Sequence, residues 1–290
     1  DDRGTIFAWI YKDDDSGTQD FFTTSDTDTN AHAFIFGIKS TGKMYLQQRA
    51  SDTDQVMTST GPSVATGGWH SIALTSDGDD YKFYYDGAAS TFTATSGTDD
   101  GDWISSVSNR DNVVIGCWLR TSAVDIYDGK AMQVAYWGGS SGTTGVLDAD
   151  AIAALHAAGK AYDIKGSGNT GNYDSWADDL AGYWRMGNHY LDTPSIIHDA
   201  SGNDFDLKQP TSGTMATLTF SGTTTFNNGW QDRGYFTPDK YTALLIQSSF
   251  NEGGTEFRDT GPGFKGTLFD GTADYAYKTV ANWDNSSTQG

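Results

Sequence analysis

Two short apolar segments flank an aspartate-rich turn in WHSIALTSDGDDYKFYY, residues 69–85. Hydrophobic and polar side chains alternate with a period of two in 69–74 and again in 81–85, which predicts two β-strands. The residues DGDD at 77–80 are typical of a tight turn between strands. The segment therefore predicts two neighbouring strands joined by a turn.

Further strands are predicted on both sides of this pair. They are expected at 5–12, 33–39, 43–47, 113–118 and 131–137. The three residues 40–42 form a hairpin loop, with Gly42 placed for a positive φ. The run 113–118 is almost continuously apolar, so we expect a strand buried on both faces. Short strands at this spacing predict an all-β antiparallel sandwich and argue against alternating βαβ units.

The composition supports this fold class and excludes several functions. The 290 residues include 35 glycines, and 38 acidic against 18 basic residues give a net charge of −20. Only Glu252 and Glu256 are glutamates, so 38 − 2 = 36 acidic residues are aspartates, which favour turns over helix interiors. Such a charge is repelled by phosphate backbones and anionic lipids, so we expect neither nucleic-acid nor membrane binding.

Other exclusions come from single residues. Cys117 is the only cysteine, so an internal disulfide is impossible, and no zinc-type spacing of Cys and His occurs. The sequence contains no run of about 18 apolar residues, which is the length needed to span a bilayer. The sequence opens on Asp1-Asp2-Arg3 without Met or an apolar leader, and we expect a fragment or a processed product.

One short surface helix is predicted over 149–158. Asp148 is a suitable N-cap, and Gly159 stands where a left-handed stop is wanted. Leu147 and Ile152 occupy the two positions of a hydrophobic staple. The apolar stripe is narrow, so the helix should lie on a surface.

A characteristic order of segments runs through the first 160 residues. The segments are Thr5–Lys12, Gly68–Ala73, Tyr84–Gly87, Ile115-Gly116, Tyr127–Gly129 with Val134, and Leu147–Gly159. Together they resemble the laminin-G/concanavalin A-like jelly roll. The resemblance covers residues 5–160 and implies two packed antiparallel sheets, in a family composed mostly of binding and adhesive modules.

The remaining chain is predicted to fall into three parts. Residues 161–209 form a strand and loop extension on the jelly roll, and 210–263 form a Thr/Gly-rich connector. The segment 264–290 contains FDGTADY at 269–275, which resembles the family's first strand. This irregular C-terminal segment either completes the present jelly roll, in the same chain or a neighbour's, or opens another repeat.

The extension also directs the functional hypothesis. Trp184 in GYWRMG, followed by HDASGN at 198–203, resembles the extension of this jelly roll in bacteriophage virion proteins. The resemblance implies a non-enzymatic structural or adhesive virion component, in a tail fibre or on a capsid surface. Its partners would be copies of itself, other virion proteins and a host-surface glycan. The alternative is a secreted or cell-surface bacterial carbohydrate-binding or adhesion module.

A glycoside hydrolase is the least favoured hypothesis. Enzymes on the scaffold that this chain resembles use paired carboxylates, typically glutamates, on one strand, and the chemistry requires an acid and a nucleophile about 5 Å apart for retention. No glutamate occurs before Glu252. His70 at the start of a strand is expected to be structural. We therefore expect no catalytic residues.

Calcium is the cofactor that the sequence favours, because clustered aspartates on loops supply the oxygen ligands it needs. The candidate ligands are Asp26, Asp28 and Asn30 in one loop, and Asp99, Asp100 and Asp102 in another. The turn at 77–80 is an alternative. In each case a solvated turn without a cation remains the simpler interpretation.

The tryptophans divide into core and candidate ligand-binding residues. Those within predicted strands are expected in the core, namely Trp9, Trp69, Trp118, Trp137 and Trp184. Trp103 and Trp176 lie near turns or loops, where an indole ring can stack on a sugar. These two are the candidate glycan-binding residues.

Overall fold

The computed structural model describes residues 1–58, 60–165, 171–187, 189, 191–192 and 196–208, and two further strands at 246–248 and 257–259. The chain divides into two compact units, 1–221 and 222–290. Most of the predicted connector 210–263 and all of the predicted strand segment 264–290 lie outside the described residues. In the described part, no helix is both long and apolar enough to cross a membrane.

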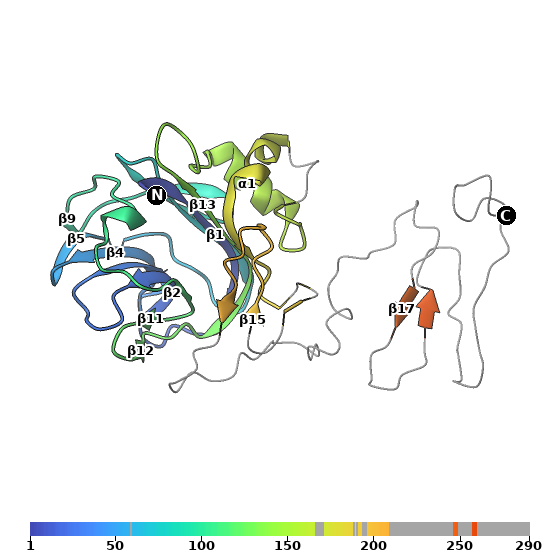
Figure 1. Ribbon diagram of the computed structural model, residues 1–290, viewed down its shortest axis with the longest axis horizontal. Coiled ribbons are helices and arrows are strands. Elements are labelled where there is room, and N and C mark those ends of the chain that lie inside the picture. Colours follow the sequence, from blue (N-terminus) through green and yellow to red (C-terminus); the bar gives the residue numbers. More distant parts are fainter. Residues whose placement is uncertain are drawn as a thin grey trace. The chain divides into compact units, whose positions relative to one another are not determined.

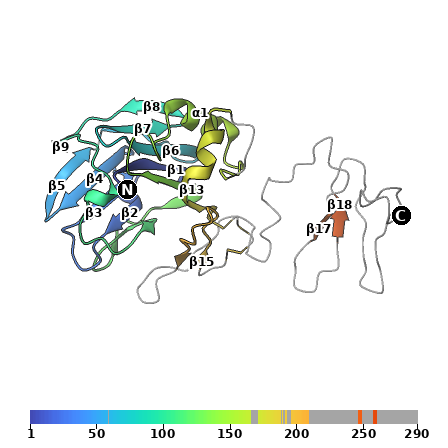
Figure 2. The same cartoon turned by 45° about the horizontal axis from the view of Figure 1, so that its top comes forward.

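The first unit contains two antiparallel sheets of six strands each within the described residues (Figures 1 and 2). Sheet A has the strand order β14-β13-β1-β6-β7-β8. Its strands are β1 (Arg3–Lys12), β6 (Trp69–Ser76), β7 (Tyr81–Tyr85), β8 (Ala88–Thr91), β13 (Gly129–Gly139) and β14 (Leu180–Trp184).

Sheet B has the order β10-β2-β3-β4-β5-β9. Its strands are β2 (Gln19–Ser25), β3 (Ala33–Ile38), β4 (Met44–Ala50), β5 (Thr53–Thr58), β9 (Ser96–Gly97) and β10 (Val114–Ile115). The short pairs are β11 (Trp118–Leu119) with β12 (Ala123–Val124), β15 (Ile196–Ile197) with β16 (Leu207–Lys208), and β17 (Ile246–Ser248) with β18 (Phe257–Asp259). The helical segments are η1 (Ile104–Ser106), α1 (Ala149–Ala158) and η2 (Gly171–Asp179).

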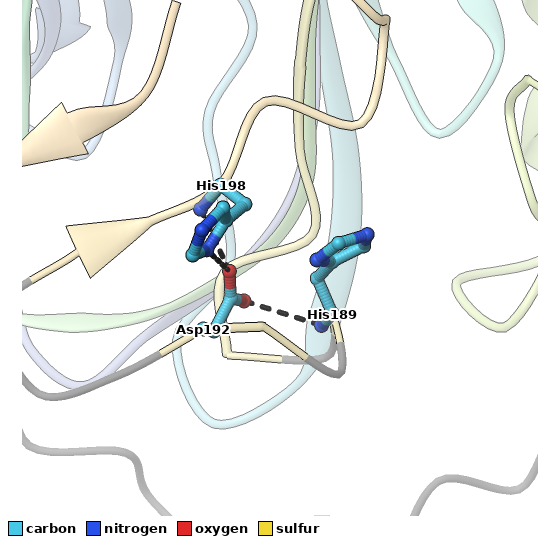
Figure 3. A group of neighbouring side chains, drawn as sticks. All are labelled: His189, Asp192 and His198. Carbon is cyan, nitrogen blue, oxygen red and sulfur yellow. Dashed lines mark hydrogen bonds and ion pairs between the residues drawn. The ribbon is translucent and has the colours of Figure 1, made fainter. Parts of the chain in front are cut away.

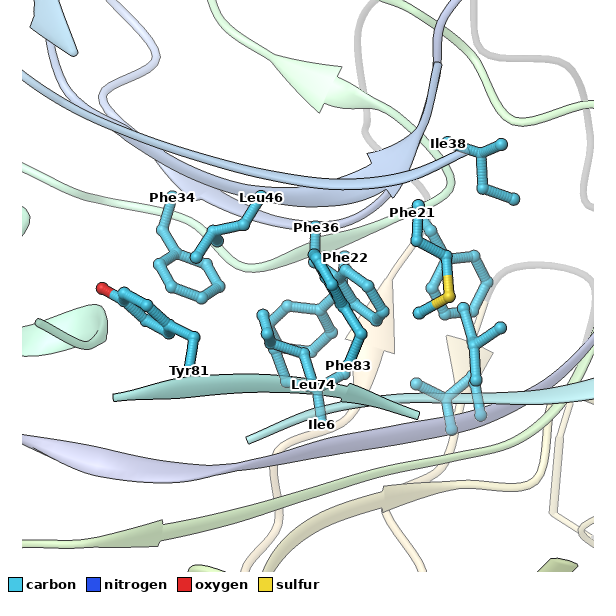
Figure 4. Close-up of a cluster of buried hydrophobic side chains, with 14 of the residues drawn as sticks. Ile6, Phe21, Phe22, Phe34, Phe36, Ile38, Leu46, Leu74, Tyr81 and Phe83 are labelled. Atoms are coloured by element: carbon cyan, nitrogen blue, oxygen red, sulfur yellow. The ribbon is translucent and has the colours of Figure 1, made fainter. Parts of the chain in front are cut away.

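The main core lies between the two sheets, as Figure 4 shows. Alternate side chains of each strand point into it because successive residues of a strand face opposite sides. Sheet A contributes Ile6, Leu74 and Phe83, and sheet B contributes Phe34, Phe36 and Leu46. The rings of Phe36 and Phe83 stack across the interface with centroids 6.1 Å apart. The predicted antiparallel β-sandwich is confirmed.

Helix α1 packs on the outer face of sheet A, and its predicted ends are confirmed. Asp148 caps it by accepting a hydrogen bond from the backbone N–H of Ala151 at 2.8 Å. Gly159 follows it with the predicted positive φ, +81°, but its ψ of 168° is extended and not left-handed helical. Ile152 and Leu155 are buried in a second core cluster between α1, η2 and sheet A. A surface helix with a narrow apolar stripe is what the sequence predicts.

The described residues 171–184 contain a helix and a strand that pack on the sandwich. Within the extension predicted as strand and loop, Gly171–Asp179 is a 3-10 helix that buries Tyr173 and Ala177 against sheet A. Strand β14 pairs with β13 and forms the edge of sheet A. The sandwich therefore extends past residue 160.

The prediction for 113–118 is wrong in one respect. Its strand β10 is only two residues long and forms the edge of sheet B beside β2. Val113 is 44% exposed, and Gly116 breaks the run with a φ of +99°. An apolar run alone does not show whether a strand is central or at an edge.

Candidate functional site

One row of side chains crosses three neighbouring strands on the outer face of sheet A. Tyr11 of β1 pairs with Lys130 of β13 on one side and with Trp69 of β6 on the other. Phe7 and Trp9 of β1 belong to the outer cluster, so alternation along the strand places Tyr11 on the same face. The pairing therefore brings two aromatic rings and an ammonium group together from distant parts of the chain.

Helix α1 leaves this row open. The ring of His156 stacks on Trp9 in the preceding row, with centroids 5.3 Å apart. Tyr11 and Trp69 lie one row further on and are both partly exposed. Their rings meet edge to face, 5.9 Å apart with an interplanar angle of 68°. The outer face of sheet A thus ends in an accessible aromatic pair.

Two lysines lie against these rings. The Nζ of Lys130 lies 4.1 Å from the ring centroid of Tyr11, and that of Lys160, just after α1, lies 5.8 Å from Trp69. Such contacts are attractive because ammonium groups approach the electron-rich ring faces. We call Tyr11, Trp69, Lys130 and Lys160 the aromatic–lysine surface. It combines apolar ring surface with hydrogen-bond donors and local positive charge on an acidic chain.

The tryptophan predictions are partly reversed. Trp103 is fully buried, packs edge to face on Phe34 and donates from Nε1 to the hydroxyl of Tyr136 at 3.2 Å. Burial excludes it as a sugar-stacking residue, which corrects the prediction. Trp69, expected in the core, is partly exposed instead, and Trp176 on η2 is also partly exposed. Tyr11 and Trp69 stand near the ends of β1 and β6. Because a helix of ten residues covers only part of a sheet, their position near strand ends would have indicated that both rings stay partly exposed.

The first candidate calcium loop is an ordered turn. Asp26 Oδ1 accepts a hydrogen bond from the backbone N–H of Asp28 at 2.8 Å. Thr27 between them donates to Asp111 at 2.6 Å. Asn30 follows in the same loop and is partly exposed. Calcium binding by this loop stays a prediction.

The second candidate loop lies against the turn 77–80. A Cβ built on Gly101 would approach the backbone N of Asp79 to 2.3 Å, so the two loops are in contact. Partial burial raises the pKa of Asp99, and the nearby carboxylates of Asp80 and Asp100 add to this. Within the described part of the chain, Asp99, Asp100 and Asp102 are not among the side chains grouped closely enough to hold a metal ion. Calcium at this loop also stays a prediction.

Two histidines and an aspartate form a different cluster after β14 (Figure 3). Ligand atoms of His189, Asp192 and His198 all lie within 4.8 Å of one another. Asp192 is buried, and its carboxylate accepts from the backbone N–H groups of Gly187, His189 and His198 at 2.9, 3.2 and 2.7 Å. No pattern in the sequence indicated this cluster. The loop has no periodicity, and the spacing His-x2-Asp-x5-His is not a known zinc pattern.

Ser71, His156 and Asp86 are close together but do not form a catalytic triad. The Oγ of Ser71 lies 2.9 Å from Nδ1 of His156, and Asp86 Oδ1 lies 3.9 Å from the same nitrogen. A triad uses opposite ring nitrogens for the nucleophile and the carboxylate. Ser71 is also buried. This group therefore links α1 to sheet A and does not activate a nucleophile.

His70 is held within the sheet, as its structural interpretation requires. Its Nδ1 lies 2.8 Å from Asp86 Oδ2 and 2.9 Å from the Tyr85 hydroxyl. Both glutamates, Glu252 and Glu256, lie outside the described residues. The described residues therefore offer no glutamate pair for glycoside hydrolysis.

The two six-stranded antiparallel sheets form a jelly-roll sandwich of the concanavalin A-like type. Residues 1–139 match the model of the laminin-G-like family described as the concanavalin A-like lectin/glucanases superfamily. The match covers β1 to β13 and stops before helix α1. No curated protein sequence matches the chain.

Several solved structures are similar in their chain path. The CBM40 domain of Ruminococcus gnavus IT-sialidase bound to α2,3-sialyllactose is 18% identical, with a TM-score of 0.44, over 53% of this chain and 83% of that one. The leech intramolecular trans-sialidase is 17% identical, with a TM-score of 0.37, over 47% and 21%. A heptameric SAP-like pentraxin of Limulus polyphemus is 14% identical, with a TM-score of 0.37, over 53% and 69%. At these identities and TM-scores, the ligands and reactions of those proteins do not transfer to this chain.

Proposed function

We propose that this chain is a non-catalytic carbohydrate-binding module that acts outside the cell or at a surface, and that its glycan contacts the aromatic–lysine surface. The observation that carries the proposal is the partly exposed pair of Tyr11 and Trp69 beside Lys130 and Lys160. A sugar ring has an apolar C–H face and a polar rim. Aromatic rings match the first, and ammonium donors match the second.

The charge of the surface indicates the class of glycan. The chain carries a net charge of −20, yet two ammonium groups lie at this one place. Lys130 is also 3.9 Å from Asp13, which offsets part of its charge. We infer a preference for a sugar that bears a carboxylate or sulfate group over the corresponding neutral sugar.

A binding role fits the site better than hydrolysis. Asp13, which lies beside this surface, forms an ion pair with Lys130 at 3.9 Å, and neither glutamate lies among the described residues. The histidine of the Ser71 group contacts both partners through one nitrogen. The family description names both lectins and glucanases, and for this chain we propose the lectin function, which is sugar binding without hydrolysis.

The narrower hypothesis is a bacteriophage virion component that assembles with copies of itself and with other virion proteins. It rests on the sequence resemblance around Trp184 and 198–203. Strand β14, which contains Trp184, is the last strand of sheet A in the described part of the chain, and residues 199–203 already cover its outer edge. The backbone N–H of Ala200 donates to the Tyr183 carbonyl at 2.7 Å, so any further strand would have to pair elsewhere. Co-purification of the chain with phage particles would support this narrower role.

The experiment that tests glycan binding is a screen of the intact chain against matched neutral and acidic oligosaccharides. Trp69→Ala should weaken binding about thirtyfold or more, because truncation of a central aromatic contact often costs more than 2 kcal/mol. Trp176→Ala tests the remaining candidate from the sequence, a partly exposed indole of the same outer cluster, and should leave binding unchanged if Tyr11 and Trp69 form the site. Equal binding by wild type and Trp69→Ala would refute the proposed surface, and release of reducing sugar would refute the non-catalytic role.

A further inference from the structure

The loop after β14 carries a cluster that glycan binding does not use. His189, Asp192 and His198 place two imidazole nitrogens and a carboxylate oxygen within 4.8 Å of one another (Figure 3). Neutral imidazole and carboxylate are the preferred ligands of Zn²⁺ and related divalent ions. We propose that these three residues bind a divalent transition-metal ion, with Zn²⁺ as the expected occupant.

The surroundings of His198 are an independent indication of a ligand site. Its Nδ1 is buried and has no hydrogen-bond partner among the described residues, and it lies 3.7 Å from Asp192 Oδ1. A buried polar atom without a partner costs free energy, so such atoms are rare in folded proteins. A metal ion bound between Nδ1 and the carboxylate would satisfy that atom.

The other nitrogen of His198 faces a second carboxylate. Its Nε2 lies 3.9 Å from Asp206 Oδ2, while Asp206 Oδ1 accepts from the backbone N–H of Asp199 at 2.9 Å. A histidine that binds a metal commonly directs its remaining ring N–H at a carboxylate, which fixes the tautomer. Asp206 is therefore a positioning residue for His198, with Nδ1 left for the metal.

The carboxylate of Asp192 is positioned before any ion binds. Three backbone N–H groups hold it, and its side chain has no exposed surface. The rings of His189 and His198 stack with centroids 5.7 Å apart and an interplanar angle of 30°. One divalent ion could therefore bind both rings and also balance the charge of the buried carboxylate.

Three protein ligands leave at least one coordination position for a water molecule or another oxygen. The ion would join the loop after β14 to β15 and so fix the extension on the sandwich. This inference is independent of the proposed function, because none of the three ligands belongs to the aromatic–lysine surface. A failure of one proposal leaves the other intact.

The test is a titration of the chelator-treated full chain with Zn²⁺ by calorimetry and with Co²⁺ by visible absorption. We expect one equivalent to bind, with Co²⁺ bands that report nitrogen and oxygen ligands. His189→Gln and His198→Gln should each weaken binding at least tenfold. Both variants keep the backbone N–H groups that hold Asp192, so the loop should stay folded. Asp206→Asn should weaken binding by about 10- to 100-fold.

His156→Gln is the matched control, because it removes a partly exposed histidine on helix α1 and should leave the Zn²⁺ affinity unchanged. Circular dichroism of every variant checks the fold. The proposal is overturned if the wild type binds neither ion at micromolar concentrations. It is equally overturned if both glutamine variants bind like the wild type, or if millimolar Ca²⁺ displaces the bound Zn²⁺, which would indicate an oxygen-only site.

Discussion

The hydroxyl of Tyr45 donates a hydrogen bond to the carboxyl group of Asp20, and both side chains are buried on the outer face of sheet B. The segment that carries β11 and β12 covers this face, with Trp118 packed near Tyr45. Burial raises the pKa of Asp20 to about 7, although the hydrogen bond from Tyr45 opposes the shift and Asp125 adds to it. The Oδ2 of Asp20 has no hydrogen-bond partner in the described part of the chain.

This pKa predicts how stability depends on pH. The unfolded chain releases the Asp20 proton near pH 4, but the folded chain keeps it until about pH 7. The contribution of Asp20 to stability is therefore full below about pH 4 and is lost as the pH rises through 7. Asp20→Asn should remove this loss, so urea denaturation should show the variant gaining on the wild type between pH 5 and pH 8. If the free energies of unfolding of Asp20→Asn and of the wild type differ by the same amount at pH 5 and at pH 8, the raised pKa of Asp20 is wrong.

The buried position of Trp103 predicts a purely structural effect. Trp103→Ala should lower the free energy of unfolding by about 3–5 kcal/mol, because it leaves a cavity beside Phe34. Trp69→Ala should cost much less, since Trp69 is partly exposed. Thermal unfolding of the two variants provides the comparison. A larger loss for Trp69→Ala would show that the two roles are assigned the wrong way round.

The two lysines of the aromatic–lysine surface predict that glycan affinity depends on salt concentration and on the charge of the sugar. Lys130→Met and Lys160→Met should each weaken binding of an acidic oligosaccharide by about two- to fivefold, the range expected for exposed ion pairs. Added salt should weaken binding of the acidic sugar by the wild type and leave that of the neutral sugar nearly unchanged. Titrations at low and high ionic strength measure both effects. Identical salt dependence for the two sugars would rule out an ionic contribution.

Calcium binding by the aspartate loops is a separate prediction. Addition of Ca²⁺ to the metal-free chain should raise its melting temperature, because an ion that binds only the folded state stabilises it. Asp26→Asn with Asp28→Asn tests one loop, and Asp99→Asn with Asp100→Asn tests the other. The loop whose variant loses the calcium effect holds the ion. If Ca²⁺ leaves the melting temperature of the wild type unchanged, both calcium sites are refuted.

Local patterns predicted much of this fold correctly. The hairpin between β3 and β4 can be predicted from the alternation of apolar and polar residues and from one glycine. Gly42 has the predicted positive φ, with a value of +76°. The ends of helix α1 can be predicted from Asp148 and Gly159, and its surface position from a narrow apolar stripe. All of these features lie within one short segment. Such elements are encoded by neighbours in the sequence, which is why one sequence suffices to predict them.

The site depends on contacts between distant residues, and there the sequence analysis failed. Whether Trp69 or Trp103 is buried depends on where α1 ends on sheet A and on how the loop before η1 enters the core. Neither fact is visible in the residues around the two tryptophans. The pairing of Tyr11 with Lys130 joins positions more than a hundred residues apart. Asp192 and His198 are close in the sequence, but their approach depends on three backbone N–H groups that bind one carboxylate, which no residue type reveals.

The most direct test of glycan binding at the aromatic–lysine surface is an NMR titration of the chain labelled with ¹⁵N at tryptophan. The indole resonance of Trp69 is assigned by its disappearance in Trp69→Phe, and an acidic oligosaccharide is then added. We predict that this resonance shifts in a saturable manner while that of the buried Trp103 does not. A saturable shift confined to Trp176, or no shift of any indole resonance, would contradict the account.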